Sequence, residues 1–188
     1  MRTHVALLRG INVGGTGKVP MAGLRSALTG RGFTDVGTWI QSGNVVLSVS
    51  PDSPDGPAEI AATVEAVLRE DFAVPRPVVV FGRDEYAAAV AANPFAGSGE
   101  PARLHAVFRS APPSDDDRRR LDAALAAERA AGGRGDAAVV GRVVYLHLPD
   151  GLGRSTLAAR LTARSGATDG GGTTRNWTTV GKLLELLG

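Results

Sequence analysis

The stretch VGTWIQSGNVVLSV, residues 36–49, decides the fold, because it contains two strand-like runs around one tight turn. Val36–Gln41 and Asn44–Val49 are rich in β-branched residues, which favour strands. Ser42 and Gly43 between them suit the short loop of a β-hairpin. The segments on either side of this hairpin therefore show which other strands can join it in one sheet.

Strand and helix signals alternate outward from the hairpin in both directions. Before it, Thr3–Arg9 is typical of a strand, and Pro20 opens a helix because proline suits the first helical position. After it, apolar residues recur at every fourth position from Ile60 to Phe72, which predicts a helix with one buried stripe. Pro77–Phe81 then predicts another strand. The order through residue 82 is β-α-β-β-α-β, the order of the ferredoxin-like plait, or split βαβ fold.

A similar order begins again after a short helix expected at residues 84–92. Arg103–Arg109 predicts a strand, and Ser114 suits the N-cap of a helix. Residues 137–148 predict a second hairpin, with Val144, Leu146 and Leu148 on one face. Ser155 suits the cap of another helix, and the chain ends in a further helix.

These signals predict an α+β protein made of two ferredoxin-like halves packed into one compact unit. We expect the N-terminal half at residues 1–83 and the C-terminal, plait-like half, which ends in a helix, at residues 84–188. A chain of 188 residues that is 43% hydrophobic can bury one good core or two small abutting cores.

Composition argues against several classes of protein. The chain has no cysteine, so disulfides, thiolate catalysis and thiolate metal sites are excluded. No apolar run approaches the roughly 20 residues of a membrane-spanning helix, and residues 1–9 lack a signal-peptide core, so we expect a cytoplasmic protein with no membrane partner. The net charge of +2 is too small for strong nonspecific binding of nucleic acids. Recognition of an anion would therefore depend on local clusters of positive charge.

Residue types that the chain uses sparingly mark its polar segments. Abundant Gly, Ala and Arg indicate a GC-rich genome, in which codons for Lys and Asn drift toward other residues wherever the protein permits. The retained Lys, Asn and Gln therefore indicate positions where a particular side chain is needed. They fall in Arg9–Pro20 (RGINVGGTGKVP), Gln41–Asn44 (QSGN), Asn93–Phe95 (NPF) and Thr173–Lys182 (TTRNWTTVGK). We expect most of these segments to converge on one site.

The segment RGINVGGTGKVP contains a loop longer than the usual strand-to-helix connection of about 2–6 residues. Its glycines would let backbone N–H groups close around an anion, with Arg9 and Lys18 adding positive charge. It does not fit a Walker A loop, because Val19 follows Lys18 where Ser or Thr is required. An Ω-loop with a purely structural role and a contact between subunits are the alternatives.

Two other segments each have a functional and a structural interpretation. In DGLGRST, residues 150–156, Arg154 and Ser155 lie where a helix N-terminus would face a phosphate, but Ser155 also suits a plain helix cap. In QSGN, Gly and Asn suit a tight turn, while Asn44 beside Gln41 suggests recognition through side-chain hydrogen bonds.

The C-terminal segment TTRNWTTVGK has the same ambiguity. Asn176 suits the cap of the last helix, and Trp177 suits the core better than a stacking surface. Arg175 and Lys182 suit either solvent or a neighbouring cleft. The three histidines each stand alone in predicted strands without metal-ligand spacing, so no metal site is expected.

We therefore predict one anion-binding cleft between the glycine-rich loop at residues 10–19 and the segments 151–155 and 173–182. Basic side chains would neutralise a small phosphorylated or carboxylated ligand, loop N–H groups would donate hydrogen bonds, and amides would recognise polar groups. The predicted ligand-binding residues are Arg9, Asn12, Gly14, Gly15, Lys18, Gln41, Ser42, Asn44, Arg154, Ser155, Arg175, Asn176 and Lys182. The residues identify neither the ligand nor a cofactor.

The ordered motifs RGINVGG, QSGNVV, NPF, DGLGRS and TTRNW together resemble the uncharacterised bacterial family called domain of unknown function 1697. The resemblance covers essentially the whole chain. It implies a compact α+β fold built on ferredoxin-like units, and it carries no known activity, substrate or catalytic residue. Thr16-Gly17 and Thr178 depart from the residues usual in the family.

Other functions stay open alongside ligand binding. Plait folds often bind RNA or single-stranded DNA on a sheet face, but aromatic residues make up only 5% of this chain, and neither Thr3–Arg9 nor Asn44–Val49 carries a ring for stacking. The polar segments could instead hold two halves or two protomers together, so the chain is a monomer or a dimer. If it is an enzyme, its residues favour phosphoryl or acyl transfer by positioning and electrostatic stabilisation.

Overall fold

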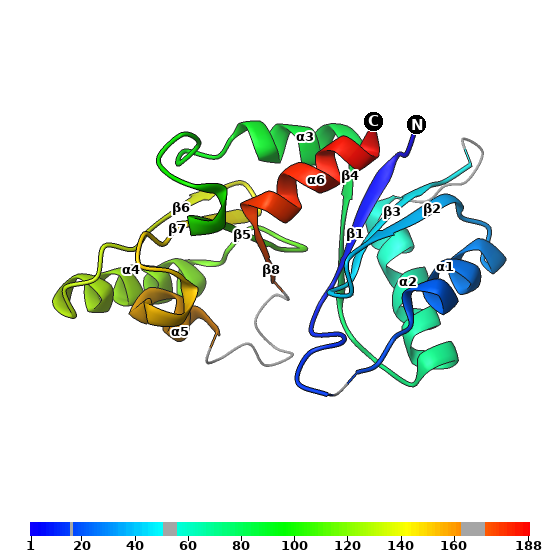
Figure 1. Cartoon of the computed structure of the whole chain (residues 1–188), viewed down its shortest axis with the longest axis horizontal. Helices are drawn as coiled ribbons and strands as arrows, with labels where there is room; N and C mark the ends of the chain where they lie inside the picture. Colours follow the sequence, from blue (N-terminus) through cyan, green and yellow to red (C-terminus); the bar gives the residue numbers. More distant parts are fainter. Residues whose placement is uncertain (16, 51–55, 163–171) are drawn as a thin grey trace. The chain divides into compact units, whose positions relative to one another are not determined.

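The computed structural model describes residues 1–15, 17–50, 56–162 and 172–188 (Figure 1). Over these residues the protein is a mixed α+β chain with two four-stranded antiparallel sheets and six α-helices. It divides into two compact units, which we call unit 1 (Met1–Ala88 and Lys182–Gly188) and unit 2 (Ala89–Gly181). None of the helices in the described ranges combines the length and apolar composition that crossing a bilayer requires.

Unit 1 contains the sheet built around the hairpin at residues 36–49. Its strand order is β2-β3-β1-β4, and each neighbouring pair of strands is antiparallel. The element order predicted through residue 82 is the order observed. The elements are β1 (His4–Leu8), α1 (Met21–Gly30), β2 (Thr34–Trp39), β3 (Asn44–Ser48), α2 (Pro57–Phe72), β4 (Val78–Gly82) and α3 (Arg83–Ala91).

Both faces of the unit 1 sheet are buried. On one face, Leu8 and Val80 belong to a core shared with residues of α1 and α2. On the other face, Leu7 is fully buried, and the ring of Phe81 packs edge-on against Tyr86 with 6.3 Å between centroids. Successive strand residues point to opposite faces, so a strand buried on both faces has a continuous apolar sequence, such as VVVFG in β4.

Unit 2 contains the second sheet, with the strand order β6-β7-β5-β8 and antiparallel pairing throughout. Its order of helices and strands repeats that of unit 1. The elements are η1 (Pro101–Arg103), β5 (Leu104–Phe108), α4 (Asp115–Ala130), β6 (Asp136–Val140), β7 (Val143–His147), η2 (Leu152–Arg154), α5 (Thr156–Thr162), β8 (Thr173–Asn176) and α6 (Trp177–Leu187).

The core of unit 2 confirms the alternation predicted for its hairpin. Val144, Leu146 and Leu148 point into one core with residues of α4 and α5. The predicted cap of α4 is also present, because the Ser114 hydroxyl accepts a hydrogen bond from Asp117 N and the Asp117 carboxylate accepts one from Ser114 N. This reciprocal capping box fixes the N-terminus of α4.

Strand β8 was not predicted from the sequence. Its four residues, Thr-Thr-Arg-Asn, pair with β5, with Ala106 opposite Arg175 and Phe108 opposite Thr173. The segment is short and polar, so it shows neither an apolar run nor a clear alternation. Only its two β-branched threonines favour a strand.

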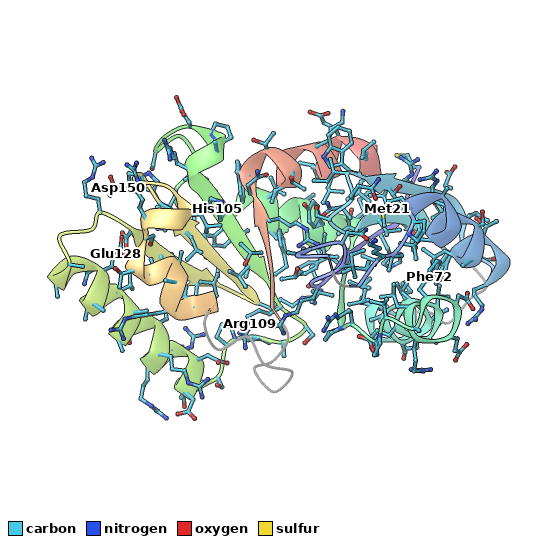
Figure 2. All side chains as sticks on the ribbon, turned by 60° about the horizontal axis from the view of Figure 1, so that its bottom comes forward. Met21, Phe72, His105, Arg109, Glu128 and Asp150 are labelled. Carbon is cyan, nitrogen blue, oxygen red and sulfur yellow. The ribbon has the colours of Figure 1, made fainter. Side chains whose placement is uncertain are left out.

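Glu128 is a buried carboxylate that joins three segments of unit 2 (Figure 2). It leaves α4 near its C-terminus and accepts hydrogen bonds from Gly135 N at 3.1 Å, Ser155 Oγ at 3.2 Å and Leu157 N at 2.7 Å. A Cβ at Gly133 would clash with the Glu128 carboxylate, so any larger residue there would displace the carboxylate from its hydrogen bonds. The carboxylate therefore fixes both the turn before β6 and the start of α5.

The C-terminal end of α6 belongs to unit 1, where two guanidinium groups bind its carbonyls. Arg2 Nη1 donates to Leu186 O at 2.8 Å, and Arg83 Nη2 donates to Leu187 O at 3.0 Å. The C-terminus of a helix has carbonyls without helical partners and a partial negative charge, so two cations stabilise it. Helices α3 and α6 each begin in one unit and end in the other.

Candidate functional site

Three segments of unit 1 meet at one end of its sheet, and we call them the loop end: residues 9–19, except Thr16, residues 40–43, and residues 73–77. Asn12 Nδ2 donates to Gln41 O at 2.8 Å, which joins the first two segments. Arg9 N donates to Pro77 O at 3.1 Å, which joins the first segment to the third. Two of the four segments expected to converge, Arg9–Pro20 and Gln41–Asn44, therefore lie together although they are far apart in the sequence.

Asn12 holds the glycine-rich loop closed at its base. Its Oδ1 accepts from Val19 N at 2.8 Å and its Nδ2 donates to Val19 O at 3.0 Å. Its backbone is left-handed, with φ of 54°, a conformation that asparagine tolerates better than most residues. Asn12 thus has the structural role of a loop clamp, and the tip of the loop projects beyond it.

The turn of the hairpin packs directly under this loop. Gly43 has a φ of 79°, and a Cβ there would lie 2.7 Å from Leu8 Cβ and 3.0 Å from Ile11. Asn44 is fully buried, and its Nδ2 donates to Trp39 O at 3.0 Å and to Ser42 Oγ at 3.1 Å. Gly43 and Asn44 are therefore required by the turn itself.

The loop end carries positive charge without compensating carboxylates in its own segments. Arg9, Lys18 and Arg76 lie in the three segments, and none of these segments contains Asp or Glu. Lys18 and Arg76 are exposed, and neither makes an ion pair with any residue in the described ranges. Exposed cations grouped in this way raise the local concentration of anions.

Arg76 was missed by sequence reasoning. A usable signal was nevertheless present, because β4 pairs with β1 and places Val78 opposite Leu8. Arg76 precedes one member of that pair by two residues, and Arg9 follows the other by one. A predicted pairing of β1 with β4 would have brought the two guanidinium groups to the same end of the sheet.

The tip of the glycine-rich loop is open to solvent. Gly14 and Gly15 are exposed with φ of 62° and 79°, and a Cβ on either would meet no atom within 4 Å. Val13 is 61% exposed, and Ile40 in the neighbouring turn is 51% exposed. Backbone N–H groups in such an open glycine turn are available to an anion.

Lys182 lies near this end through a contact inside unit 1. Its Nζ is 5.5 Å from the centre of the Trp39 ring and donates to Glu185 Oε2 at 2.9 Å. Trp39 is the last residue of β2 and immediately precedes the turn. The cation–π contact therefore holds the Lys182 ammonium beside the hairpin turn.

The other predicted binding residues belong to unit 2 and have structural partners there. Ser155 is buried, donates to Glu128 and accepts from Ala158 N at 3.1 Å, so it caps α5. Asn176 Oδ1 accepts from Thr179 N at 2.9 Å and caps α6. Arg175 is buried, and its Nη1 donates to Thr173 Oγ1 at 2.6 Å and to Thr174 O at 2.9 Å. Arg154 is exposed.

The predicted binding residues are thus divided between the two units. Lys182 and the members from Arg9 to Asn44 lie in unit 1, and the members from Arg154 to Asn176 lie in unit 2.

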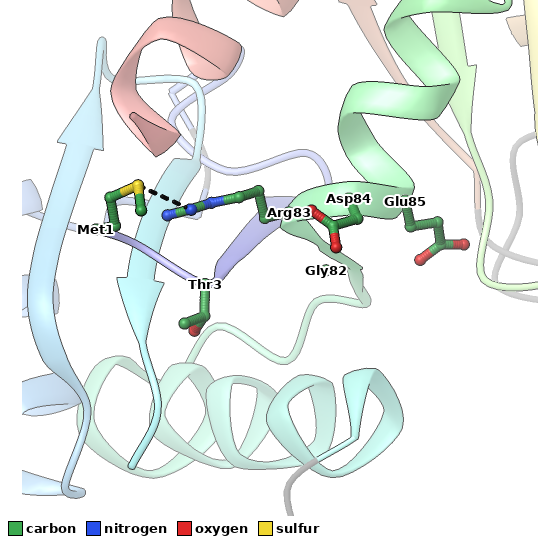
Figure 3. Close-up of a pocket in the computed structure, with 6 residues that line it drawn as sticks. All are labelled: Met1, Thr3, Gly82, Arg83, Asp84 and Glu85. Carbon is green, nitrogen blue, oxygen red and sulfur yellow. Dashed lines mark hydrogen bonds between the residues drawn. The ribbon is translucent and has the colours of Figure 1, made fainter. Parts of the chain in front are cut away.

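A hollow of about 500 Å³ lies at another part of unit 1 and contains none of the predicted residues. It is lined by Met1, Thr3, Gly82, Arg83, Asp84 and Glu85 (Figure 3). The guanidinium of Arg83 extends toward Met1 and donates to its Sδ at 3.0 Å, besides its bond to the end of α6. Arg83 therefore binds residues near both ends of the chain, Met1 and Leu187.

Burial alters the pKa values of two titratable side chains in unit 2. Burial lowers the pKa of His105, whose Nδ1 has no hydrogen-bond partner among the described residues. Burial also raises the pKa of Tyr145 to about 12, and its hydroxyl donates to Ala89 O at 2.6 Å. Within the described ranges, no three His, Asp or Glu side chains are grouped so as to hold a metal ion.

Comparison with known proteins identifies a protein family of unknown function and a solved structure of similar fold. A search of curated proteins finds no match. The solved structure of the conserved bacterial protein SP0830 from Streptococcus pneumoniae is similar over 100% of this chain and 99% of that chain, with a TM-score of 0.72 and 22% sequence identity. At this identity the likeness concerns the fold alone. Residues 1–145 match the family described as "Protein of unknown function (DUF1697)". Since this match spans most of the chain, the protein belongs to the DUF1697 family.

Proposed function

We propose that the loop end of unit 1 binds a small phosphorylated or carboxylated ligand. The observation that carries this proposal is the charge of the three segments, which contribute Arg9, Lys18 and Arg76 and no carboxylate. The exposed Gly14-Gly15 turn adds backbone N–H donors beside these cations. An anion would gain charge-assisted hydrogen bonds from both sources.

The clamp formed by Asn12 supports the proposal, because it reduces the cost of ordering the loop. A binding loop that is fixed before the ligand arrives loses less conformational entropy on binding. Asn12 secures the base of the loop to Val19 and Gln41, which leaves the tip and Lys18 directed to solvent. Gln41 and Ser42 lie beside this clamp and would contact polar groups of the ligand.

We also infer that each unit is a ferredoxin-like plait. Both units have the element order β-α-β-β-α-β, and their strand orders, β2-β3-β1-β4 and β6-β7-β5-β8, correspond position by position.

Binding of RNA on the sheet of such a fold needs exposed aromatic rings. In unit 1, Phe81 is 1% exposed and Leu7 is fully buried, so small-anion binding at the loop end has the better support.

Thermal unfolding with and without anions tests the proposed site. Inorganic phosphate, a nucleoside monophosphate and citrate are compared with chloride at equal ionic strength. A ligand at about 100 times its Kd stabilises the folded state by about 2.7 kcal/mol. We expect at least one of these anions to raise the Tm, and the Lys18→Ala, Arg76→Ala double variant to lose most of that increase.

The matched control is Arg160→Ala, which removes one exposed cation from α5 in unit 2. It should keep the increase in Tm. Arg154→Ala tests the predicted contribution of unit 2 in the same assay. The proposal fails if no anion stabilises the protein, or if the double variant responds as strongly as the wild type.

A further inference from the structure

The loop end exposes apolar side chains as well as cations. In the part of the chain that the structure describes, the exposed large hydrophobic residues are Met1, Val13, Ile40, Val140 and Leu152. Val13 and Ile40 both belong to the loop end, whereas the other three lie in separate segments. Exposed hydrophobic residues scattered singly are normal, but neighbouring ones form apolar surface of the kind that contacts a ligand or a partner.

A hydrogen bond between two segments brings these apolar side chains to the same place. Asn12 Nδ2 donates to Gln41 O at 2.8 Å. Val13 follows the first of these residues in the chain, and Ile40 precedes the second. Consecutive Cα atoms are only about 3.8 Å apart, so the two apolar residues lie on either side of this bond.

The cations of the loop end start from the same region. Asn12 N donates to Gly17 O at 3.0 Å, which places the residue before Lys18 beside the base of the loop. A Cβ at Gly17 would lie 3.5 Å from Val74 Cγ1, so the segment that carries Arg76 packs against the loop as well. Lys18 and Arg76 are both exposed. Positive charge and apolar surface can therefore contact the same bound molecule.

Ile40 has a strained backbone that its side chain does not explain by packing. Its φ of 50° is left-handed, a conformation that is sterically unfavourable for a β-branched residue. Glycine or asparagine would fit this position of the turn with less strain. The side chain is 51% exposed, so the core does not require it. Strained residues of this kind are typical of functional sites.

The other isoleucines of the chain support this interpretation. Isoleucine codons begin with A and T, so a GC-rich genome also uses this residue sparingly, and the chain has three, Ile11, Ile40 and Ile60. Ile11 and Ile60 are fully buried in the core of unit 1. Ile40 differs from both, which indicates that its side chain is needed for a contact outside this core.

We infer that the anion bound at the loop end carries an aliphatic group. Its phosphate or carboxylate would contact Lys18 and Arg76, and its apolar part would cover Val13 and Ile40. The inference rests on the proposed function of the loop end and adds the chemical class of the ligand. Alkyl phosphates and short fatty acids have this combination of negative charge and apolar surface. Each methylene group that is buried against the two side chains would strengthen binding by about threefold.

Calorimetric titration of the full chain with two series of ligands tests the inference. One series is methyl, butyl and hexyl phosphate, and the other is acetate, butyrate and hexanoate, all at equal ionic strength and below any micelle concentration. In the series whose head group binds, we expect the longest member to bind at least about tenfold more tightly than the shortest. Hexanol has the alkyl group without the charge and should bind at least about tenfold more weakly than the longest member.

The Val13→Ser, Ile40→Asn double variant locates the contact. We expect the ratio of affinities between the longest and the shortest member to fall to about one, because the apolar surface is removed. Asparagine tolerates the left-handed backbone, so the variant should unfold at a Tm close to that of the wild type. The matched control is Val140→Asn, which removes an exposed apolar residue beside the turn of the other hairpin. It should keep the wild-type ratio.

The outcomes separate this inference from the proposed function. If a head group binds but all members of its series bind equally, the aliphatic group is wrong and the anion site stands. If no member of either series binds, both are wrong. An unchanged ratio in the double variant, or hexanol that binds as tightly as the charged ligands, would overturn the inference. A wild-type dimer that the double variant dissociates, without a gain from longer alkyl groups, would overturn it too, because the apolar pair would then join two copies of the chain.

Discussion

The Asn12 side chain forms two opposed hydrogen bonds with the backbone of Val19, accepting from its N–H at 2.8 Å and donating to its carbonyl at 3.0 Å. An amide side chain thus pairs with one residue much as a neighbouring strand would. A third bond, from Nδ2 to Gln41 O, extends the clamp to the hairpin turn.

Replacing Asn12 by Asp tests this clamp most directly. The carboxylate keeps an acceptor for Val19 N but faces the carbonyls of Val19 and Gln41 with oxygen in place of an N–H donor. We expect a loss of about 2–3 kcal/mol of unfolding free energy, because two hydrogen bonds disappear and the acceptors are left unpaired. Urea unfolding gives the value.

Asn12→Gly and Asn12→Ala separate the clamp from the backbone. Glycine tolerates the φ of 54°, whereas alanine adds the strain of a left-handed conformation, so alanine should cost about 1 kcal/mol more than glycine. Equal stability of Asn12→Gly and the wild type would mean that the side-chain bonds contribute nothing.

The two hairpin turns give a matched pair of glycine substitutions. Gly43→Ala places a Cβ 2.7 Å from Leu8 Cβ at a φ of 79°, while Gly141→Ala meets no atom within 4 Å at a φ of 56°. Both variants bear the left-handed strain of about 1–2 kcal/mol, and only Gly43→Ala adds a steric clash of about 1–3 kcal/mol. Thermal unfolding should show the larger drop in Tm for Gly43→Ala.

Glu128 should be sensitive to removal of its charge. Glu128→Gln keeps the shape, but its amide nitrogen must face at least one of the N–H donors now held by Oε1 and Oε2. We expect a loss of about 1–3 kcal/mol, the cost of a buried polar group without its partner. The exposed Glu100→Gln serves as the control and should change the urea midpoint little.

Asp117 should make part of the stability of α4 dependent on pH. Burial opposes ionisation of Asp117, but hydrogen bonds from the backbone and hydroxyl of Ser114 and the charge of Arg109 together lower its pKa. A lowered pKa in the folded state contributes stability that is present above the unfolded pKa, near 3.9, and is lost as the pH falls through the folded value.

Asp117→Asn should therefore be less stable than the wild type at pH 7 by about 1 kcal/mol. The gap between the two proteins should narrow as the pH falls below about 4, where the wild type also loses its charge. Unfolding curves from pH 7 to pH 2.5 provide the check, with Asp122→Asn as the control. A gap that stays constant across this range would contradict a role for the charge.

Sequence patterns with strong periodicity predicted the elements of the fold well. The stripe from Ile60 to Phe72 became α2, and the alternation of Val144, Leu146 and Leu148 became the core face of β7 and the residue after it. β8 escaped prediction because a four-residue polar strand has too little pattern. Its identity as a strand comes from pairing with β5, which is a tertiary contact.

The candidate site was harder to predict, for a different reason. Scarcity of Asn correctly marked positions 12, 44 and 176 as demanding one particular side chain, and the structure uses each of them for a turn, clamp or cap. The scarcity of a residue type shows that a position requires that particular side chain. It does not show whether the side chain is required for the structure or for binding a ligand. Arginine is abundant in this chain, so scarcity could not identify Arg76 as a candidate.

Helices α3 and α6 each begin in one unit and end in the other, which affects how a single unit can be produced by itself. Because α3 finishes in unit 2 and α6 finishes in unit 1, a gene truncated after residue 88 would encode a unit 1 that lacks residues 182–188. Such a fragment loses Leu186 and Leu187, the carbonyl partners of Arg2 and Arg83. An isolated unit 1 is better made by fusing the C-terminal heptapeptide ahead of Met1 through a flexible linker, a circularly permuted design that keeps the whole unit on one polypeptide.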